Sequence, residues 1–371
     1  MTGPALVIGG GLAGASVAIR LAEAGRSVVV LEREAGPHDK VCGEFLSYEA
    51  VASLRALGVD PLALGAVAID RVTVCAGARR ASAPLPFTAL SLSRRVLDEA
   101  LLARAAAADA VVRRGVRVTG LERDGAAWIV RTEGGETLAA PQVFLASGKH
   151  DVRGWKRPPG RQSDLIGFKQ HLRLAPAMTR ALDRGVELHL FAGGYAGLEL
   201  VEDGRANLCL VVRKTVFAAL GGRWEALRER LLQDCQHLRE RLDGAEGETP
   251  RPLAIAAIPY GHVGERAGGL WRLGDQAAVI PSFAGEGMSI ALHSAGLAAR
   301  YVLAGRSAEA CQQALAGHVR GQVARATWVS QVLVRPGAQA AIGLVLATAP
   351  GLAGLVARGT RLPGRAQLSP G

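Results

Sequence analysis

The distribution of apolar residues at the start of the chain predicts a compact strand–helix–strand unit. Ala5 to Ile8 and Val28 to Leu31 are short, wholly apolar runs, as is typical of buried parallel strands. Between them, Leu12 to Ala24 carries its apolar residues at helical spacing. We therefore expect a βαβ unit in which a run of glycines joins the first strand to the helix.

Helices and strands continue to alternate over the next stretch. The periodicity predicts helices at about Tyr48 to Leu57 and Ser93 to Ala107, with a strand near Val72 to Cys75 between them. Asp124-Gly125 and Gly134-Gly135 are typical of hairpin turns. They separate three further apolar runs, for which we expect a β-meander inserted into the first domain: Val116 to Leu121, Trp128 to Thr132 and Val143 to Ala146.

From Leu165 to Arg213 the pattern changes to strict alternation, which is typical of antiparallel strands with two different faces. In the first strand, Lys169, His171 and Arg173 fall on one face, opposite to apolar residues. We expect this basic face to be solvated, to pair with Glu187 on a neighbouring strand, or to bind a partner. Three further runs fit the same sheet: Val186 to Phe191, Tyr195 to Val201 and Ala206 to Val212.

The chain then becomes helical and returns to a second glycine-rich segment. A charged helix is predicted at about Trp224 to Leu242, and another strand before Tyr260. The apolar run Leu270 to Leu273 leads into Gly274-Asp275, and a helix is predicted from Ser289 to Leu303. This return completes the first domain.

The first glycine-rich turn has the spacing Gly-x-Gly-x-x-Gly, directly after a strand and at the start of a helix. Gly9 allows a sharp turn, Gly11 lets the backbone approach a pyrophosphate, and Gly14 permits close packing of the helix on the strand. The free N–H groups and the positive dipole end of the helix attract phosphate. Glu32 ends the second strand, where a carboxylate can accept hydrogen bonds from a ribose. The segment predicts a bound adenine dinucleotide, either NAD or FAD.

The second glycine-rich segment favours FAD. Asp275 follows a strand, where its carboxylate can hold a ribityl hydroxyl, and Pro281 leads into Gly285 to Met288 at the start of a helix. The N–H groups at that helix start are suited to the polarised end of a reduced flavin ring. A strand, an aspartate and a Gly-x-Gly helix start in series therefore predict the ring end of FAD.

These segments resemble the flavoprotein superfamily that includes para-hydroxybenzoate hydroxylase and the geranylgeranyl reductases. The resemblance covers roughly residues 1–305 and includes a third segment, Ser93-Arg94 with Leu97-Asp98. It implies that Arg94 reaches the sugar and phosphate region of FAD, and that Val118 lies in the segment whose backbone meets the adenine. The residues expected to bind FAD are Gly9, Gly11, Ala13, Gly14, Glu32, Arg33, Cys42, Gly43, Arg94, Val118, Asp275, Gly285, Gly287 and Met288.

The expected fold class is α/β, with a Rossmann-like FAD-binding domain of the glutathione-reductase type, an antiparallel β-sheet substrate domain and C-terminal helices. We assign residues 1–160 to the FAD-binding domain with its meander and 161–265 to the substrate domain. Residues 266–305 return to the FAD-binding domain, and 306–371 form the C-terminal helices. Two intimately joined domains agree with a chain of 371 residues of which 49% are hydrophobic.

The sequence Lys40-Val41-Cys42-Gly43-Glu44 resembles a loop of the geranylgeranyl-reductase branch that lies beside the isoalloxazine ring. The match implies that Cys42 and Gly43 contact the cofactor, and we take Cys42 and Glu44 as candidate catalytic residues. A carboxylate near an apolar flavin pocket can have a raised pKa, which would let Glu44 protonate or position the substrate. The alternatives are a small buried cysteine and a solvated loop glutamate.

Three departures from the family leave the electron donor and the reaction open. Asp151 lacks the glycine that completes the Asp-Gly motif of the aromatic hydroxylases, which helps NAD(P)H to dock. Asp275 is followed by Gln276-Ala277-Ala278, without the histidine usual in the family. The chain also contains no Trp-x-Trp-x-x-Pro sequence, the main signature of flavin-dependent halogenases.

Three functions are consistent with these residues. The first is a reductase of the geranylgeranyl-reductase type, in which reduced FAD passes a hydride to a double bond of an apolar biosynthetic intermediate. The second is a monooxygenase that hydroxylates an aromatic or polyketide-like substrate in secondary metabolism. The third is a non-enzymatic flavin redox sensor. We favour the reductase, with NAD(P)H as electron donor and an apolar small molecule as substrate, carrier-bound or lipid-like forms included.

Charge and cysteine content exclude several other partners. The formal net charge is +11, but the arginines are scattered and aromatic residues make up only 4% of the chain, so we expect no binding of nucleic acid. The five cysteines are widely spaced and form no Cys-x-x-Cys pair. We therefore expect neither a disulfide framework nor a metal site.

We expect a cytoplasmic protein, because Met1 to Leu6 leaves no room for a signal peptide before the first strand. Gly337 to Ala357 is uncharged and long enough to span a membrane, but Pro350-Gly351 interrupts it and much of it is Ala and Gly. We expect two short helices there that cover the substrate domain. Peripheral contact with a membrane surface is the alternative.

Overall fold

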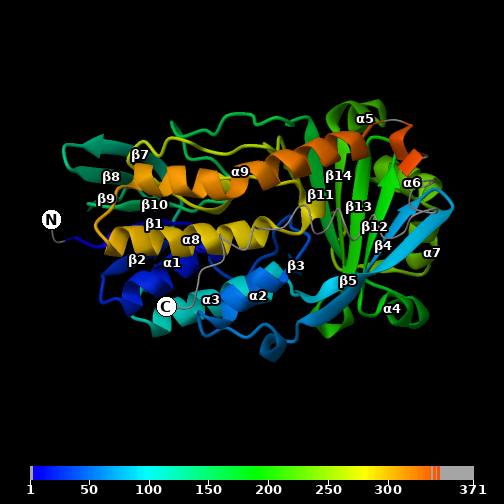
Figure 1. The fold of residues 1–371 in the computed structure, drawn as a ribbon, viewed down its shortest axis with the longest axis horizontal. Helices are drawn as coiled ribbons and strands as arrows, with labels where there is room; N and C mark the ends of the chain where they lie inside the picture. Colours follow the sequence, from blue (N-terminus) through cyan, green and yellow to red (C-terminus); the bar gives the residue numbers. More distant parts are fainter. Residues whose placement is uncertain (1–2, 336, 340, 343–371) are drawn as a thin grey trace.

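The computed structural model of the chain describes residues 3–335, 337–339 and 341–342. Two large sheets dominate these residues and lie toward opposite ends of the molecule (Figure 1). The first sheet has the strand order β17-β10-β1-β2-β6, and all its neighbouring strands are parallel. Its strands are β1 Ala5–Ile8, β2 Val28–Leu31, β6 Val111–Arg113, β10 Val143–Leu145 and β17 Trp271–Arg272.

Both faces of this parallel sheet are covered. Ala5 and Val7 point into a core that they share with the neighbouring helices, whereas Leu6 and Ile8 point into a core that they share with a small antiparallel meander. Strands buried on both faces are apolar throughout, which explains the unbroken apolar run of β1. The covering elements are α1 Leu12–Glu23, α3 Arg94–Ala107 and α8 Gly287–Leu303 on one face, and β7 Val118–Asp124, β8 Ala127–Thr132 and β9 Thr137–Ala140 on the other.

The second sheet has nine strands in the order β15-β11-β14-β13-β12-β4-β5-β3, with β16 also paired to β11. Its neighbours are antiparallel except for β12 and β4, which are parallel. The strands are β3 Phe45–Leu46, β4 Val67–Ala76, β5 Arg79–Ser91, β11 Leu165–Arg173, β12 Gly185–Phe191, β13 Gly194–Leu200, β14 Ala206–Arg213, β15 Glu246–Gly247 and β16 Leu253–Ala256.

The two faces of the nine-stranded sheet have different neighbours. Phe168, Leu198 and Leu210 pack against Leu227 and other apolar residues of helices on the outer side. The opposite face looks toward the parallel sheet and packs against the end of the long helix α9, which runs alongside α8 (Figure 1). The remaining helices are α2 Tyr48–Arg55, α4 Pro176–Leu182, α5 Lys214–Ala219, α6 Trp224–Asp234, α7 Gln236–Arg241 and α9 Ala308–Leu333, with short 3-10 turns at Leu62–Leu64, Glu202–Gly204, Gly274–Gln276 and Ser282–Ala284.

The predicted fold class is confirmed, with two corrections to individual elements. Val143–Leu145 is a central strand of the parallel sheet, and the third strand of the meander is Thr137–Ala140. The reason is that Val143–Leu145 is buried on both faces and shows no alternation. The charged segment from Trp224 to Leu242 forms two helices that meet at Cys235.

The structure also places some segments in unforeseen surroundings. The hairpin of β4 and β5 belongs to the nine-stranded sheet, although its residues fall within the range 1–160.

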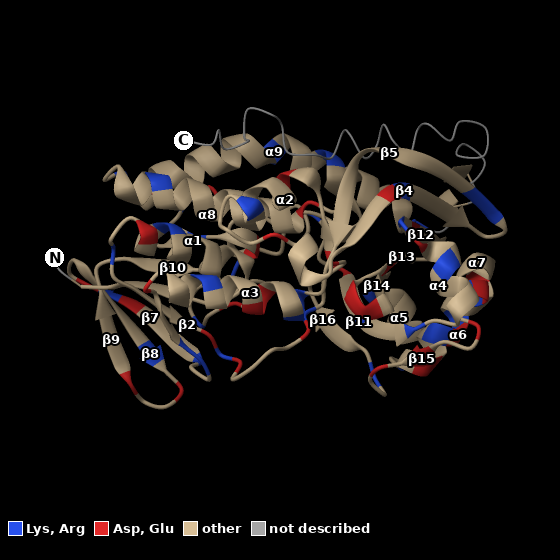
Figure 2. Cartoon of the chain, turned by 90° about the horizontal axis from the view of Figure 1, so that it is seen from below, with Lys and Arg blue, Asp and Glu red and all other residues tan. Residues whose placement is uncertain are grey.

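Most of the apolar segment Gly337 to Ala357 lies outside the described residues. Within the described ranges, the helices are too short or too polar to cross a membrane. Figure 2 shows Lys and Arg on many separate helices and strands, with Asp and Glu between them.

Candidate functional site

A cavity of about 630 Å³ is lined by residues of both sheets and of the loops between them. The first glycine turn, the end of β2 and the segment Val116 to Val118 contribute one group of lining residues. Strands β11, β14 and β16 contribute another. Fourteen of the fifteen residues that the sequence singles out reach this cavity, namely Gly9, Gly11, Ala13, Glu32, Arg33, Cys42, Gly43, Glu44, Arg94, Val118, Asp275, Gly285, Gly287 and Met288.

The fifteenth residue, Gly14, lies in α1 and lets this helix pack closely on the backbone of the turn. A Cβ atom at Gly14 would lie 1.8 Å from the carbonyl oxygen of Gly9, so only glycine allows α1 to pack this closely on the turn. Gly9 itself has φ +101°, and a Cβ there would lie 2.5 Å from the carbonyl oxygen of Ala146. The turn therefore needs glycine at both positions, for the reasons that the spacing predicts.

Two positively charged side chains, Arg94 and Lys40, lie next to the start of α1. A Cβ atom at Gly11 would lie 3.2 Å from Nη2 of Arg94 and 3.3 Å from Nζ of Lys40. Both side chains bind Asp98, Arg94 through Nε and Nη2 at 2.9 Å each and Lys40 at 2.7 Å. Burial alone would raise the pKa of Asp98, but Arg94 and Lys40 lower it, so the carboxylate stays charged. Two positive charges, one negative charge and a helix start match a pyrophosphate group.

Glu32 is held in one orientation by the backbone. Its Oε2 accepts a hydrogen bond from N of Gly10 at 2.6 Å, and its Oε1 accepts one from N of Glu34 at 3.0 Å. The side chain is buried yet reaches the cavity, so its free lone pairs can accept hydrogen bonds from ribose hydroxyls. Close by, Nη2 of Arg33 lies 3.1 Å from Nε2 of His150, another lining residue.

The second glycine segment supplies the other half of a dinucleotide site. The carboxylate of Asp275 faces the cavity 3.4 Å from Nζ of Lys149. Gly285 has φ +68°, and a Cβ there would lie 2.6 Å from the ring of Phe45. The chain can therefore turn at Gly285 and begin α8 with Gly287 and Met288 in the cavity wall. These groups suit the ribityl chain and the polar edge of a flavin.

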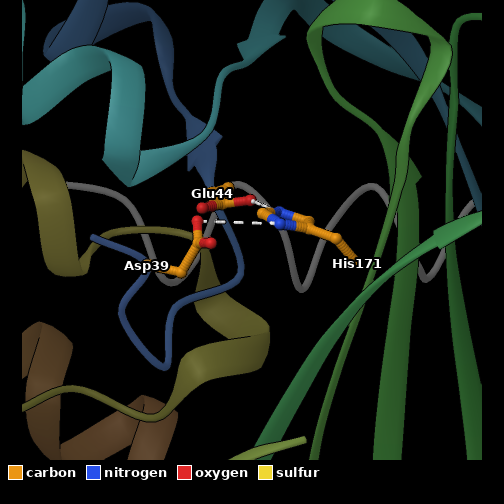
Figure 3. A group of neighbouring side chains, drawn as sticks. All are labelled: Asp39, Glu44 and His171. Carbon is orange, nitrogen blue, oxygen red and sulfur yellow. Dashed lines mark hydrogen bonds and ion pairs between the residues drawn. The ribbon is translucent and has the colours of Figure 1, made fainter. Parts of the chain in front are cut away.

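Glu44 is completely buried and joins the two halves of the molecule (Figure 3). Its Oε1 accepts a hydrogen bond from N of Arg94 at 2.7 Å and forms an ion pair with Lys169. Its Oε2 lies 2.7 Å from Nε2 of His171. The backbone of Glu44 is left-handed, with φ 57°, a conformation that a non-glycine residue keeps only when its contacts hold it there.

The predicted rise in the pKa of Glu44 is wrong. Burial does raise the pKa, but the charge of Lys169 and the hydrogen bonds from His171 and Lys169 outweigh it, so the pKa lies below its ordinary value. Glu44 is therefore a carboxylate with both oxygens engaged. The lowered pKa does not favour the role of proton donor that we expect from the sequence.

Asp39 completes a trio with Glu44 and His171, drawn in Figure 3. One ligand-type atom from each of the three side chains lies within 4.8 Å of the other two, and Nδ1 of His171 is 3.6 Å from Oδ1 of Asp39. Such a trio could hold a metal ion on spacing alone. Lys169 already supplies the positive charge next to Glu44, so ion pairs account for the cluster.

The register of the nine-stranded sheet explains why these side chains meet. His171, Asn207 and Glu199 are direct cross-strand neighbours on β11, β14 and β13. Because alternate residues of a strand share a face, Lys169 of β11 lies on the same face as His171, with Cys209 opposite it on β14. This face is turned toward the cavity, which both Cys209 and Gly167 line.

The prediction that the basic face of the first strand is solvated or paired with Glu187 is wrong for two of its three residues. Lys169 and His171 are buried, and only Arg173 is exposed. Glu187 instead pairs with Arg241 at 2.7 Å. The loop that carries Glu44 covers the basic face and supplies the missing counter-charge, so Lys169 and His171 are unavailable as a partner surface.

Cys42 is half-buried in the cavity wall and is tied to the sheet through its backbone. Its carbonyl oxygen accepts a hydrogen bond from Nδ2 of Asn207 at 3.2 Å, and its Sγ accepts one from N of Glu44 at 3.4 Å. Nδ2 of Asn207 also donates to Oε1 of Glu199 at 2.8 Å. Burial raises the pKa of Glu199 to about 8, so this carboxyl is mostly protonated at neutral pH.

Sequence reasoning missed several residues of the site. These residues are Lys40, Lys149, Lys169, His171, Glu199 and Asn207. Lys40 begins the segment that the sequence singles out for Cys42 but has no expected role there, and the other five carry no motif. Apart from Glu199, which bonds Asn207 eight positions away, they gain their places through contacts far along the chain. The alternation in β11 is the one signal for Lys169 and His171, and it indicates a shared face without showing what covers that face.

Comparison with known proteins supports the assignment of an FAD-binding domain. The family model described as "FAD binding domain" matches residues 2–150. A menaquinone reductase of Mycolicibacterium smegmatis is 27% identical over 316 residues, which are 81% of this chain and 76% of that protein. A menaquinone reductase of Mycobacterium tuberculosis is 27% identical over 310 residues, 79% of this chain and 75% of that protein.

Solved structures of similar fold include flavin-dependent halogenases. The halogenase CmlS has a TM-score of 0.78 at 20% identity, with 100% of this chain and 74% of that chain covered. The myxobacterial chondrochloren halogenase CndH has a TM-score of 0.76 at 21% identity, with 97% and 90% covered. At this level of identity the likeness shows the fold alone, and the chain lacks the halogenase sequence Trp-x-Trp-x-x-Pro.

The family match, the fold and the dinucleotide geometry lead to one conclusion. The chain is an FAD-dependent oxidoreductase, and it is similar in sequence and fold to the superfamily that includes para-hydroxybenzoate hydroxylase. Its cofactor is FAD, as the two glycine segments predict.

Proposed function

We propose that this FAD-dependent oxidoreductase reduces a carbon–carbon double bond in an apolar, isoprenoid-type substrate, as the geranylgeranyl reductases do, and takes its electrons from NAD(P)H. The observation that carries the proposal is the apolar part of the cavity. It adjoins the FAD-binding residues, and its walls come from the nine-stranded sheet and the segment that follows β16: Gly167, Val211, Leu253, Ile255 and Ile258. Burying apolar surface in such a pocket favours an apolar ligand.

The relatives support the same class of substrate. They are named menaquinone reductases, and menaquinone is a quinone that carries a polyprenyl chain. At 27% identity the likeness supports the chemical class, an apolar prenyl compound, and leaves the individual compound to experiment.

The proposed reaction balances with FAD and a nicotinamide. When bound and reduced, FAD supplies a hydride to one carbon of the double bond. One proton added to the other carbon completes the reduction, and NAD(P)H restores the electron pair. We assign delivery of the proton to the thiol of Cys42, which lies in the cavity wall. Solvent then returns the proton to the thiol.

Glu44 has a different task in this proposal. Its oxygens hold N of Arg94 on one side and Lys169 and His171 on the other. These contacts fix the loop of Cys42 between the cofactor residues and the substrate sheet. Glu44 is thus a positioning residue that acts through Cys42 and Arg94.

The alternative function is a monooxygenase, in which reduced FAD reacts with oxygen before a substrate is hydroxylated. The nine-stranded sheet beside the cavity is compatible with both reactions, so fold does not separate them. Oxygen dependence does separate them.

The test is a reaction in strict absence of oxygen. The FAD-loaded protein is incubated with menaquinone bearing an unsaturated side chain and with NADH or NADPH, and the products are extracted into air before mass spectrometry. A reduced quinone ring is reoxidised by air, whereas a saturated side chain keeps its two added hydrogens. We expect the product that keeps them.

Two results would overturn the proposal. The first is that air returns all of the product to the starting quinone, which means that only the ring is reduced. The second is a product that forms only with oxygen present and that contains an added oxygen atom. A reaction with nicotinamide but without the protein is the control.

A further inference from the structure

Three hydroxyl groups meet at the wall of the apolar part of the cavity. The hydroxyl of Tyr260 donates a hydrogen bond to Oγ of Ser282 at 3.0 Å, and the hydroxyl of Tyr195 lies 3.1 Å from the same oxygen. Tyr195 belongs to β13, Tyr260 to the segment after β16, and Ser282 to the 3-10 turn that precedes α8. Three segments far apart in sequence therefore converge on one serine oxygen.

The three residues differ in their access to the cavity. The side chains of Tyr195 and Tyr260 are 2% and 3% exposed, whereas Ser282 is exposed. Both Ser282 and Tyr260 line the cavity, so the surface that Ser282 exposes belongs to the cavity wall. Ser282 is thus the most exposed residue of the cluster.

The hydrogen-bond chemistry leaves Ser282 with a proton to donate. A serine oxygen accepts up to two hydrogen bonds and donates one. Tyr260 donates to it, and Tyr195 lies at donor distance on the same oxygen. When Tyr195 also donates, the O–H of Ser282 is left to donate to a ligand in the cavity. Burial raises the pKa of both tyrosines, so both keep their protons at neutral pH.

The cluster is also held in place. The carbonyl oxygen of Tyr260 accepts hydrogen bonds from N of Arg161 at 2.8 Å and from N of Gln162 at 3.0 Å. The ring of Tyr195 packs edge-on against Phe283, with 5.9 Å between the ring centroids. Donors fixed in advance lose less conformational entropy when a ligand binds.

We propose that Ser282, supported by Tyr260 and Tyr195, is a binding subsite for a neutral oxygen acceptor, the carbonyl or quinone oxygen at the polar end of an otherwise apolar substrate. The surroundings favour this class of ligand. Ile258 and Val279 line the same part of the cavity, and both are buried hydrophobic residues. A neutral oxygen can enter such a wall at modest cost, whereas a charged group would lose its hydration without an opposite charge in the cluster.

The inference rests on the proposed function and narrows it to substrates that carry such an oxygen. It predicts that the protein distinguishes two ligands of nearly the same shape, 2-methyl-1,4-naphthoquinone and 2-methylnaphthalene. Binding of each is measured by equilibrium dialysis against the FAD-loaded, oxidised protein without reductant. Turnover does not enter this measurement.

The variants Ser282→Ala and Tyr260→Phe each remove one hydroxyl and little volume. We expect each to weaken binding of the quinone by about 2- to 10-fold, the usual net value of one hydrogen bond to a neutral acceptor. Binding of the hydrocarbon should stay at the wild-type value. Tyr48→Phe, at an exposed position on α2, is the matched control and should change neither ligand.

The result that would overturn the subsite is an equal effect on quinone and hydrocarbon, or no effect on the quinone in both variants. FAD content is measured for each variant, and because the two variants lie on different segments, a folding defect in one leaves the other as the test. If the variants weaken quinone binding as expected but the wild-type protein saturates no double bond, the subsite stands and the proposed function is wrong. A protein that saturates the bond with unchanged quinone binding in both variants would lose only the subsite.

Discussion

Nε2 of His171 lies 2.7 Å from Oε2 of Glu44, although the two residues are 127 positions apart in the chain. Both side chains are buried. His171 belongs to β11 of the nine-stranded sheet, and Glu44 belongs to the loop that carries Cys42 past the FAD-binding residues. Together with Lys169, this contact joins the two halves of the enzyme at the cavity.

The buried charge of Glu44 should be costly to remove. In Glu44→Gln the ammonium of Lys169 loses its counter-ion in a buried place, so we expect the free energy of unfolding to fall by about 3–5 kcal/mol. Urea unfolding followed by circular dichroism measures it. The control Glu34→Gln removes a partly exposed ion pair with Arg33 and should cost at most about 1 kcal/mol. Equal losses in the two variants would contradict the role of Glu44.

A second variant separates charge from packing at the same place. In the double variant Glu44→Gln/Lys169→Met both charges are gone, so we expect it to be more stable than Glu44→Gln alone. The same unfolding experiment measures this difference. A double variant that is less stable than either single variant would show that the contribution of the pair is not electrostatic.

Glu199 should give the protein a stability that declines as the pH rises. Its pKa is about 8 in the folded protein and near the ordinary 4.5 when unfolded, so the folded state binds one more proton between these values. Stability from this group is therefore full below about pH 4.5 and is lost as the pH passes 8. Glu199→Gln should remove this decline and be more stable than wild type above pH 8, on the order of a few kcal/mol. If the free energy of unfolding declines with pH in parallel in wild type and variant, the decline does not come from Glu199.

The glycine turn predicts a sharp difference between two alanine variants. Gly14→Ala places a methyl group against the backbone of Gly9, so we expect α1 to shift and FAD to be lost or bound at least about 10-fold more weakly. Gly36→Ala is the control, since nothing lies within 4 Å of its Cβ position. The measurement is the FAD content of the purified proteins and their affinity after reconstitution. Full FAD content in Gly14→Ala would refute the close packing.

Cys42 should affect the chemical step rather than cofactor binding. Cys42→Ala removes the thiol, so we expect kcat to fall by about 100-fold with FAD content unchanged, as for loss of a positioned proton donor. Cys42→Ser, which keeps a hydroxyl, should recover part of the rate. A kcat unchanged in Cys42→Ala would assign the proton to solvent.

The cofactor half of the site could be predicted from the sequence because its geometry is local. Gly9 and Gly14 act through a turn and the helix that follows directly, and Glu32 ends the next strand. The spacing of these residues in the sequence is therefore enough to predict the turn, the helix and the strand that follows. Arg94 and Asp275 are further away, and their order relative to the glycine turn supplied the prediction.

The substrate half could be predicted only in outline. Alternation showed that Lys169 and His171 share a face, but the residue that neutralises them, Glu44, lies more than a hundred positions earlier. The same separation in sequence explains why the predicted rise in the pKa of Glu44 is wrong. The prediction considered only an apolar pocket, whereas Lys169, which lowers the pKa, lies 125 positions later in the chain. The hydroxyl cluster at Ser282 likewise needs three segments at once.

The central claim is that the cavity brings reduced FAD and a double bond together, and a single turnover tests it most directly. The FAD-loaded protein is reduced without oxygen, freed of excess reductant and mixed with one equivalent of the unsaturated menaquinone. We predict that the flavin is reoxidised without oxygen and that, after exposure of the extract to air, one substrate molecule per flavin keeps two added hydrogens. A flavin that stays reduced until oxygen is admitted would contradict the account.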